Sequence, residues 1–273
     1  MILPVAVLDH VVVNALDRLD TVADTYRRLG FTLTPRGHHT LGSSNHLAVF
    51  GTDYLELLGV EPGPDNCTDI LDWPPGLNGL VFKTFDADGV YATLHGAGLP
   101  VLPPQAFSRP VDTPSGPRDA AFRTVRLERD AVPAGRLYFC EHLTPALVWD
   151  DAVRRHPNGA VSIKRAVVAA QDPAALLTLL SRLFGNCTAD GRLTAGAAHI
   201  DVVTPAALQV EFGGCMPDAD GRQQFMAALM IRTASLDHTA DALHAGGIAN
   251  KRHGNTITVA ARDAGGVTLV FGH

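Results

Sequence analysis

One order of predicted elements recurs four times along this chain of 273 residues: a strand, a helix that ends at glycine, and further strands. The copies begin with the predicted strands Val5–Val13, Leu80–Phe85, Ile163–Ala170 and Met226–Ala234. One such unit cannot cover the hydrophobic face of its own strands, so copies are expected to pack together. The recurrence predicts an α+β fold with two halves, each built from two copies.

Apolar residues at helical spacing, followed by glycine, predict one helix in each copy, at 19–29, 86–97, 173–184 and 236–245. Short apolar or β-branched runs predict the remaining strands. These are 31–34, 46–51 and 53–60 in the first copy, 120–129 and 136–143 in the second, 197–203 and 207–212 in the third, and 256–261 and 267–271 in the fourth. The proline-rich stretch 100–117 is predicted to be a long loop.

The four copies also suggest a division into domains. Residues 1–149 hold the first two copies and residues 161–273 the last two, the second pair being poorer in groups able to do chemistry. Residues 150–160 between them are largely polar, which is typical of a linker. We therefore expect a first domain with the functional cavity and a second, degenerate domain.

Charge and composition exclude several classes of partner. The 22 Lys and Arg residues are scattered and outnumbered by 28 Asp and Glu, whereas nucleic-acid binding needs a concentrated basic face. The uncharged runs are too short for a membrane span, and the first residues lack the basic start of a signal peptide. Four cysteines without paired spacing suit reduced thiols. We expect a cytoplasmic protein that binds neither nucleic acid nor membrane.

Two predicted strands of the first copy are apolar runs interrupted by an ionisable side chain, His10 in one and Glu56 in the other. Burying an imidazole or a carboxylate among aliphatic side chains is costly unless the group is paired or bound to a metal. One explanation is a polar site shared by the two strands. The other is that His10 donates to a backbone carbonyl and Glu56 pairs with an arginine, each in a structural role.

A polar loop lies between strands of the first copy and contains His38, His39 and the run Gly42-Ser43-Ser44-Asn45. Asn45 and one of the histidines are candidates for binding a carbonyl or carboxylate of a substrate. The alternative is a simple turn, for which Gly, Ser and Asn are the usual residues. Three arginines close to the predicted long loop are further candidates, for an anion clamp. They are Arg109, Arg118 and Arg123.

Several segments of the first half together carry a resemblance to a known family. They are 8–13, 29–31, 38–45, 54–57 and 139–145, followed by 148–149 and 156–160. Through them the chain resembles the glyoxalase-like domain proteins of the vicinal oxygen chelate superfamily. The second half resembles that superfamily only in its order of elements. The resemblance implies an α+β fold of four βαβββ modules paired into two half-open barrels, each around a cavity.

The resemblance also implies a set of site residues, because metal-using members take ligands from the first and last strands of each module. By position, the metal ligands are His10, Glu56 and Glu141, and the fourth position falls at Asn78. Asparagine is a poorer ligand than His or Glu for zinc or iron. The residues expected to bind substrate are His39, Asn45, Asn78 and His142.

Glu141 and His142 are adjacent on the predicted strand 136–143, so their side chains point to opposite faces. Only one of them can reach the cavity. Position in the resembling family favours Glu141 as the ligand, whereas the phrase His-Leu-Thr-Pro that begins at His142 favours a structural or substrate-binding role for that histidine.

The function expected from the sequence is that of a metal-dependent enzyme of the vicinal oxygen chelate type, with isomerase, lyase or dioxygenase chemistry on a small oxygen-rich substrate. Zinc, nickel, manganese or iron(II) suits the ligands, and Glu56 and Glu141 are the expected catalytic groups. No nucleotide-binding fingerprint is present. The alternative is a metal-free protein that binds or sequesters a small molecule. Because modules can also pair between chains, a homodimer is allowed.

Overall fold

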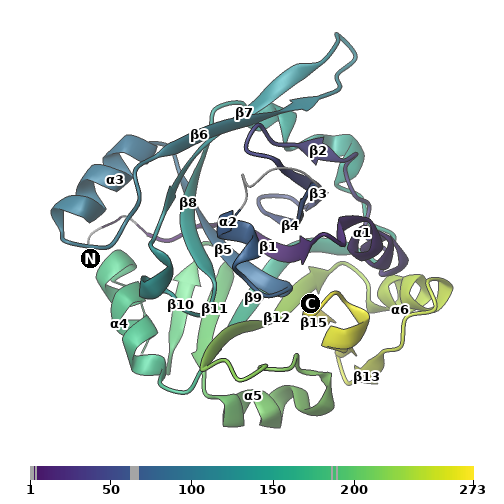
Figure 1. The fold of residues 1–273 in the computed structure, drawn as a ribbon. Coiled ribbons are helices and arrows are strands. Elements are labelled where there is room, and N and C mark those ends of the chain that lie inside the picture. Colours follow the sequence, from purple (N-terminus) through teal and green to yellow (C-terminus); the bar gives the residue numbers. More distant parts are fainter. Residues whose placement is uncertain (1–2, 4, 62–67, 186, 189) are drawn as a thin grey trace.

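In the computed structural model, which describes residues 3, 5–61, 68–185, 187–188 and 190–273, the strands form two sheets, one from each half of the chain (Figure 1). The first sheet has the order β2-β3-β4-β1-β5-β8-β7-β6. Its strands are β1 Leu8–Leu16, β2 Gly37–His38, β3 Ser43–Val49, β4 Tyr54–Val60, β5 Gly76–Thr84, β6 Gln105–Val111, β7 Arg118–Arg126 and β8 Arg136–His142.

The second sheet has the order β10-β11-β9-β12-β15-β14-β13. Its strands are β9 Ala160–Ala170, β10 Arg192–Ala195, β11 Ala198–Val203, β12 Gln224–Thr233, β13 Lys251–His253, β14 Thr256–Val259 and β15 Thr268–Gly272. The helices are α1 Leu19–Arg28, α2 Thr68–Leu71, α3 Ala87–Gly96, α4 Pro173–Phe184, α5 Pro205–Phe212 and α6 Leu236–Ala245. Short 3-10 helices lie at Arg129–Ala131, Pro145–Leu147, Asp151–Val153, Gly213–Cys215 and Ala261–Asp263. In the described part of the chain, no helix is long and apolar enough to cross a membrane.

The pairing of strands confirms the predicted α+β fold of paired modules. In the first sheet, β1 is antiparallel to β5, while β1 and β4 are parallel, as are β5 and β8. The second sheet repeats this pattern with β9 antiparallel to β12 and with the parallel pairs β9–β11 and β12–β15. Each sheet therefore joins two modules through their first strands.

The first sheet curls until its two edges almost meet. Beside the edge strands β2 and β6, the backbone N–H of Thr40 donates to the carbonyl of Ser108 at 2.9 Å. The N–H of Ser108 donates in turn to the hydroxyl of Thr40 at 3.2 Å. These bonds turn the sheet into a nearly closed barrel with one concave face.

The predicted strand 207–212 is wrong, because this segment is helix α5. Thr204 accepts a hydrogen bond from the N–H of Ala207 at 3.2 Å, and Pro205 occupies the first turn, which are both helix-start features. Only Leu208 of the helix is buried. The third module therefore has two strands after helix α4, β10 and β11, which take the places of β3 and β4, and it has no counterpart of the edge strand β2; the second sheet accordingly has seven strands and the first has eight.

Two further predictions in the first half are corrected by the structure. Residues 31–34 form no strand, because Thr32 donates its backbone N–H to the ring of His156 at 3.0 Å and not to a neighbouring strand. The predicted loop 100–117 contains β6, which pairs with β7 at the edge of the sheet. Pro110 is tolerated within β6 because an edge strand leaves some backbone N–H groups without a ladder partner.

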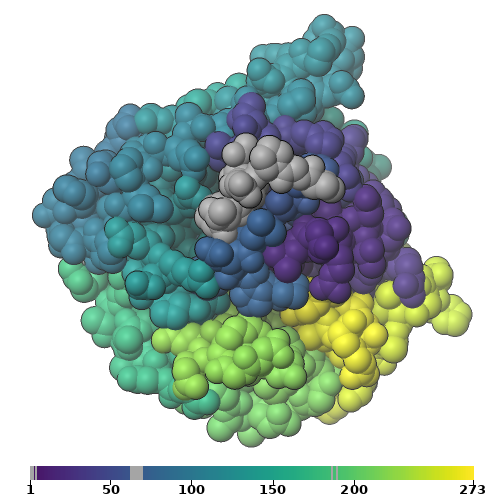
Figure 2. All heavy atoms as spheres, viewed as in Figure 1, coloured from purple at the N-terminus to yellow at the C-terminus, as the bar shows by residue number. Residues whose placement is uncertain are grey.

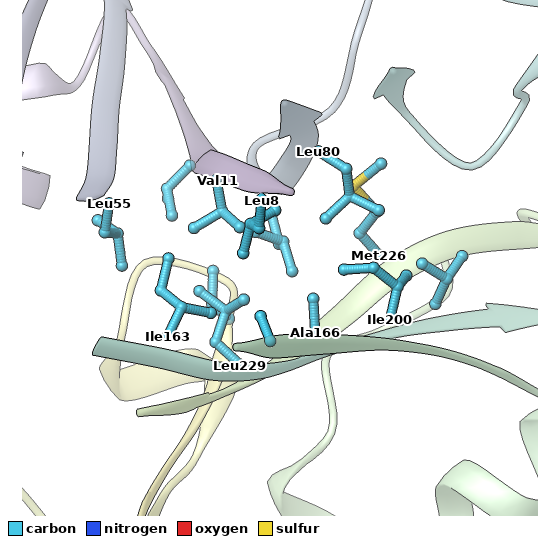
Figure 3. Close-up of a cluster of buried hydrophobic side chains, with 14 of the residues drawn as sticks. Leu8, Val11, Leu55, Leu80, Ile163, Ala166, Ile200, Met226 and Leu229 are labelled. Atoms are coloured by element: carbon cyan, nitrogen blue, oxygen red, sulfur yellow. The ribbon is translucent and has the colours of Figure 1, made fainter. Parts of the chain in front are cut away.

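The two sheets pack face to face and share one hydrophobic core (Figure 3). Residues from both sheets meet in it, including Leu8, Val11, Leu55 and Leu80 from the first and Ile163, Ala166, Ile200, Met226 and Leu229 from the second. In Figure 2 the purple-to-teal residues of the first half and the green-to-yellow residues of the second adjoin along a continuous boundary. Because this core lies between the two sheets, the other, concave face of the first sheet is not part of it.

Part of the segment predicted to be a linker is buried against both halves. Asn158 is fully buried and donates its side-chain amide to the carbonyl of Leu29 at 2.9 Å. Its backbone carbonyl accepts hydrogen bonds from the hydroxyls of Thr233 and Thr239, at 3.1 and 2.7 Å. The segment thus ties α1 to β12 and α6. Cys140, Cys187 and Cys215 are free thiols, and Cys67 lies outside the described residues.

Candidate active site

The concave face of the first sheet encloses a cavity of about 110 Å³. Alternation along the strands selects the residues that face it, so Tyr54, Glu56 and Leu58 of β4 point inward while Leu55 and Leu57 point to the shared core. Its polar or ionisable lining residues are His10, His39, Ser43, Asn45, Tyr54, Glu56, Gln105, Arg109, Thr124, Arg126, Arg136, Tyr138 and Cys140. The apolar lining residues are Leu41, Leu47, Leu58, Ile70, Phe107 and Phe122.

A β-bulge in β1 brings Asp9 and His10 together. Leu8 lies opposite Phe82 of β5 and His10 lies opposite Val81, so Asp9 is the extra residue between them. Neighbouring side chains of a regular strand point to opposite faces, but the bulge re-aims Asp9. Its Oδ2 atom lies 2.7 Å from Nδ1 of His10.

Asp9 is fully buried and lies between two imidazoles. The same Oδ2 atom lies 2.8 Å from Nε2 of His142 on β8. Burial alone would raise the pKa of the Asp9 carboxyl. The hydrogen bonds from His10 and His142, together with their charge, more than offset that effect and hold its pKa below the usual range. Asp9 is therefore a permanent carboxylate behind His10.

The other nitrogen of His10 faces the cavity. Its Nε2 lies 3.7 Å from Oε2 of Glu56, and both side chains are more than nine-tenths buried. The imidazole stacks on the ring of Tyr54 with centroids 4.2 Å apart. Asp9 therefore occupies Nδ1 of His10, and Nε2 on the other side of the ring is the atom that faces Glu56.

Asn45 connects Glu56 with His39. The amide nitrogen of Asn45 donates to Oε1 of Glu56 at 2.6 Å and lies 3.2 Å from Nε2 of His39. The other ring nitrogen of His39 lies 2.8 Å from the hydroxyl of Ser43. Desolvation in the cavity wall lowers the pKa of His39 to about 4. His39 is therefore neutral near pH 7, with Nε2 as an acceptor.

Four of the predicted site residues, His10, His39, Asn45 and Glu56, are brought together at one end of the cavity. Asn78 and His142 do not belong to this group and do not line the cavity. His142 reaches the group through Asp9. Asn78 lies at a second irregularity of β5, between the residues paired with Val12 and Val13, and its Oδ1 accepts Nε of Arg136 at 3.2 Å.

Glu141 is not brought to the cavity. Tyr138 and Cys140 face the cavity from β8, so Glu141 lies on the opposite face of that strand. Its carboxylate accepts the backbone N–H of Ala87 at 3.1 Å, at the start of helix α3, and lies 3.9 Å from Arg123. Glu141 thus supplies a helix N-terminus with an acceptor, and His142 is the member of the pair that reaches the polar network.

Sequence reasoning missed Asp9, Arg136 and Cys140 as members of this region. The one available signal was the pair of ionisable residues Asp9 and His10 inside an apolar strand. Strict alternation along β1 would place Asp9 on the face opposite His10, and a bulge depends on the partner strand and leaves no mark in β1 alone.

Two groups of side chains are candidates for a metal. Among the described residues, Asp9, Cys140 and His142 place one donor atom each within 4.8 Å of one another. This group suits a cation poorly, because Asp9 already accepts two imidazoles, Lys83 lies 3.5 Å from its other oxygen, and burial raises the pKa of the Cys140 thiol well above its usual value.

A second group, His10, His39 and Glu56, has a suitable set of donors, although its donor atoms are not among those that lie within 4.8 Å of one another. Two imidazoles and one carboxylate are a donor set suited to iron(II), manganese, nickel or zinc. His10 has its second nitrogen held by a carboxylate, as metal-bound histidines usually do. The amide of Asn45 now bridges Glu56 and His39, and its buried Oδ1 has no hydrogen-bond partner. Rotation of this amide would release the carboxylate oxygen of Glu56 and the ring nitrogen of His39 from their present partner.

Comparison with protein families gives one match, the glyoxalase-like domain, over residues 8–184. Among functionally curated proteins the sequence has no match. Among solved structures, the chain is similar to a hypothetical protein from Staphylococcus aureus, at 13% identity and a TM-score of 0.67, with 97% of this chain and 98% of that chain covered.

Two further solved structures share the fold. A mutant of 4-hydroxymandelate synthase from Streptomyces coelicolor aligns at 12% identity and a TM-score of 0.60, covering 98% of this chain and 92% of that one. A fusion protein of a xylose isomerase-like TIM barrel and 4-hydroxyphenylpyruvate dioxygenase aligns at 13% identity and a TM-score of 0.60, covering 98% of this chain and 49% of that one. At such identities the likeness concerns the fold.

Proposed function

Because this chain belongs to the glyoxalase-like domain family of the vicinal oxygen chelate superfamily, we propose that its cavity is the active site of a metal-dependent enzyme. In this proposal His10, Glu56 and His39 hold a divalent ion, and a small oxygen-rich molecule is the substrate. Isomerase, lyase and dioxygenase chemistry all fall within the proposal, since each requires stabilisation of negative charge on a substrate oxygen.

The observation that carries the proposal is the approach of His10 to Glu56. Their Nε2 and Oε2 atoms lie 3.7 Å apart at the cavity wall, while Asp9 holds the opposite nitrogen of the imidazole. A carboxylate behind a histidine orients the ring and raises the basicity of its free nitrogen. A histidine with a purely structural role does not require a carboxylate beside each of its two ring nitrogens.

The chemistry follows from what each side chain can do. Glu56 faces the cavity and is placed to accept a proton from a substrate carbon and to return it at another position. His39 is neutral and offers a lone pair, while Tyr54 and Tyr138 retain their protons because burial raises the pKa of each phenol. A divalent ion, when bound, would act as a Lewis acid that stabilises the oxyanion formed on proton loss.

The test is metal analysis of protein purified without chelator or affinity-tag metal, and again after addition of manganese, iron(II), nickel or zinc. Three variants accompany the wild type: His10→Ala, Glu56→Gln and Glu141→Gln. Glu141→Gln is the matched control, because that carboxylate lies on the other face of the sheet at the start of α3.

We expect about one metal equivalent per chain in the wild type and in Glu141→Gln, and its loss in His10→Ala and Glu56→Gln. A wild type that takes up none of the four metals would contradict the proposal. So would a folded Glu141→Gln protein that has lost the metal, because the ligands would then lie elsewhere.

A second candidate function is metal-free binding of a small molecule in the same cavity. One observation favours it: among the described residues that line the cavity, three arginines face a single carboxylate, and excess positive charge opposes cation binding. Failure of metal uptake in the experiment above, combined with ligand binding in the cavity, would select this candidate.

A further inference from the structure

Arg109 is a buried cation that forms no ion pair with any carboxylate in the described part of the chain. It projects from β6 into the cavity and is 5% exposed. Among the described residues no carboxylate forms an ion pair with it, and its Nε atom has no hydrogen-bond partner. Desolvation lowers its pKa, yet a guanidinium remains charged at any physiological pH. An unpaired buried charge costs free energy, so a partner from outside the described residues is indicated.

Gly37 leaves room for the Arg109 side chain. A side-chain carbon at Gly37 would come within 2.7 Å of Cδ of Arg109 and within 2.6 Å of Oδ1 of Asn45. Glycine at position 37 therefore leaves the space that both side chains occupy. A rigid, desolvated guanidinium has the preorganisation that bidentate recognition of an oxyanion requires.

The rest of the cavity adds positive charge and an apolar wall. Arg136 lines the cavity and has a buried Nη2 atom without a hydrogen-bond partner. Phe107 and Phe122 stack with ring centroids 5.2 Å apart beside Arg109, and His39 meets Phe107 edge to face at 5.1 Å. The cavity thus combines a group able to bind an anion with an apolar wall.

We propose that the ligand of this cavity is a small organic carboxylate, with its anionic group on Arg109 and its apolar body against Phe107 and Phe122. The inference rests on the proposed function in one respect, namely that the same molecule reaches the His10–Glu56 end of the cavity. A carboxylate satisfies the orphaned Nε atom and compensates the buried charge in one step. A cavity of about 110 Å³ restricts the molecule to a small acid.

The experiment compares two matched probes, benzoate and benzamide, which share shape and differ in charge. Binding is measured by calorimetry to the wild type, Arg109→Gln, Arg109→Lys and Arg118→Gln. Arg118 is the control, because it lies in the neighbouring strand β7 but is exposed and outside the cavity lining. Acetate and acetamide form a second matched pair, which tests the same preference for charge with molecules that contain no ring.

We expect the wild type and Arg118→Gln to bind the carboxylate at least about tenfold more tightly than the amide, as a charge-assisted bidentate pair provides. Arg109→Gln should lose this preference, and Arg109→Lys should keep part of it because the charge remains without the planar fork. Arg109→Gln should also melt no lower than the wild type without ligand, since a buried unpaired charge is removed.

Two results would overturn the inference: a wild type with no carboxylate preference in either pair, or a preference that survives in Arg109→Gln. The same titrations before and after addition of each of the four metals, manganese, iron(II), nickel and zinc, separate this inference from the proposed function. Arg109-dependent carboxylate binding without metal uptake refutes the enzyme and keeps the ligand class. Metal uptake without Arg109-dependent carboxylate binding refutes the ligand class and keeps the proposed enzyme.

Discussion

At the scale of single residues, the site depends on how each imidazole nitrogen is occupied. Asp9 binds Nδ1 of His10 and Nε2 of His142 through one oxygen, and Glu56 faces the remaining nitrogen of His10. One buried carboxylate therefore orients two histidines. Outer partners of this kind decide the tautomer and direction of the donors that face a cavity.

The Asp9→Asn substitution tests this arrangement. The introduced amide keeps one oxygen that can accept from both imidazoles, but it carries no negative charge, so both hydrogen bonds lose their charge assistance. We expect the affinity for manganese or zinc to fall by about 10- to 100-fold, the range found for outer-shell substitutions. Metal titration by calorimetry measures the change.

Asp53→Asn is the matched control for Asp9→Asn, because Asp53 is also a buried carboxylate of the first sheet but does not line the cavity. Its metal affinity should equal that of the wild type. Equal affinity in Asp9→Asn as well would show that Asp9 does not orient the ligand His10.

At the scale of elements, the start of β4 is bonded to the second sheet. Oδ1 of Asp53 accepts the backbone N–H of Ile163 in β9 at 2.8 Å. Burial raises the pKa of the Asp53 carboxyl from the ordinary 3.8 to about 6, against the hydrogen bonds from Ile163 and Thr52, which lower it. The folded protein thus binds a proton at Asp53 more tightly than the unfolded chain does.

This shift predicts how stability changes with pH. A raised carboxyl pKa contributes stability that is complete below about pH 4 and is lost as the pH rises through about 6. The free energy of unfolding of the wild type should therefore fall relative to that of Asp53→Asn between pH 4 and 7, by at most about 3 kcal/mol. Urea unfolding at several pH values measures the difference.

The exposed Asp17 provides the control for this pH series, since Asp17→Asn should run parallel to the wild type. A constant difference between wild type and Asp53→Asn across the whole range would contradict the assignment of the shift to Asp53.

At the scale of the whole molecule, the two halves share one core, although their strands belong to separate sheets. The inner faces of both sheets contribute to a single hydrophobic cluster, and Asn158 of the connecting segment bonds to residues of each half. Separating the halves would expose both inner faces to water at a large cost in hydrophobic free energy.

This shared core predicts one cooperative unfolding transition. Both tryptophans, Trp73 and Trp149, lie in the first half, so their fluorescence reports that half alone, whereas far-UV circular dichroism reports both. We expect the two signals to change at the same urea concentration. A fluorescence transition separated from the dichroism transition would show instead that residues 1–149 and 161–273 unfold as independent domains.

Much of this organisation could be predicted from the sequence because the relevant signals are local. Glycine stops and apolar periodicity mark α1, α3, α4 and α6, and the fourfold order of elements leads to the paired modules. The interruption of apolar strands by His10 and Glu56 pointed to the wall of the cavity for the same reason. The residues adjacent in the chain are enough to predict that an ionisable group within an apolar strand is buried.

Only the tertiary structure decided where three other residues act. The bulge that re-aims Asp9 depends on β5, and the direction of Glu141 depends on the register of β8 with its partner strands. Arg109 is buried only because the edges of the first sheet close over it. Register, bulges and closure arise from contacts between distant segments, whereas periodicity along one strand or helix reports only which of its faces is apolar.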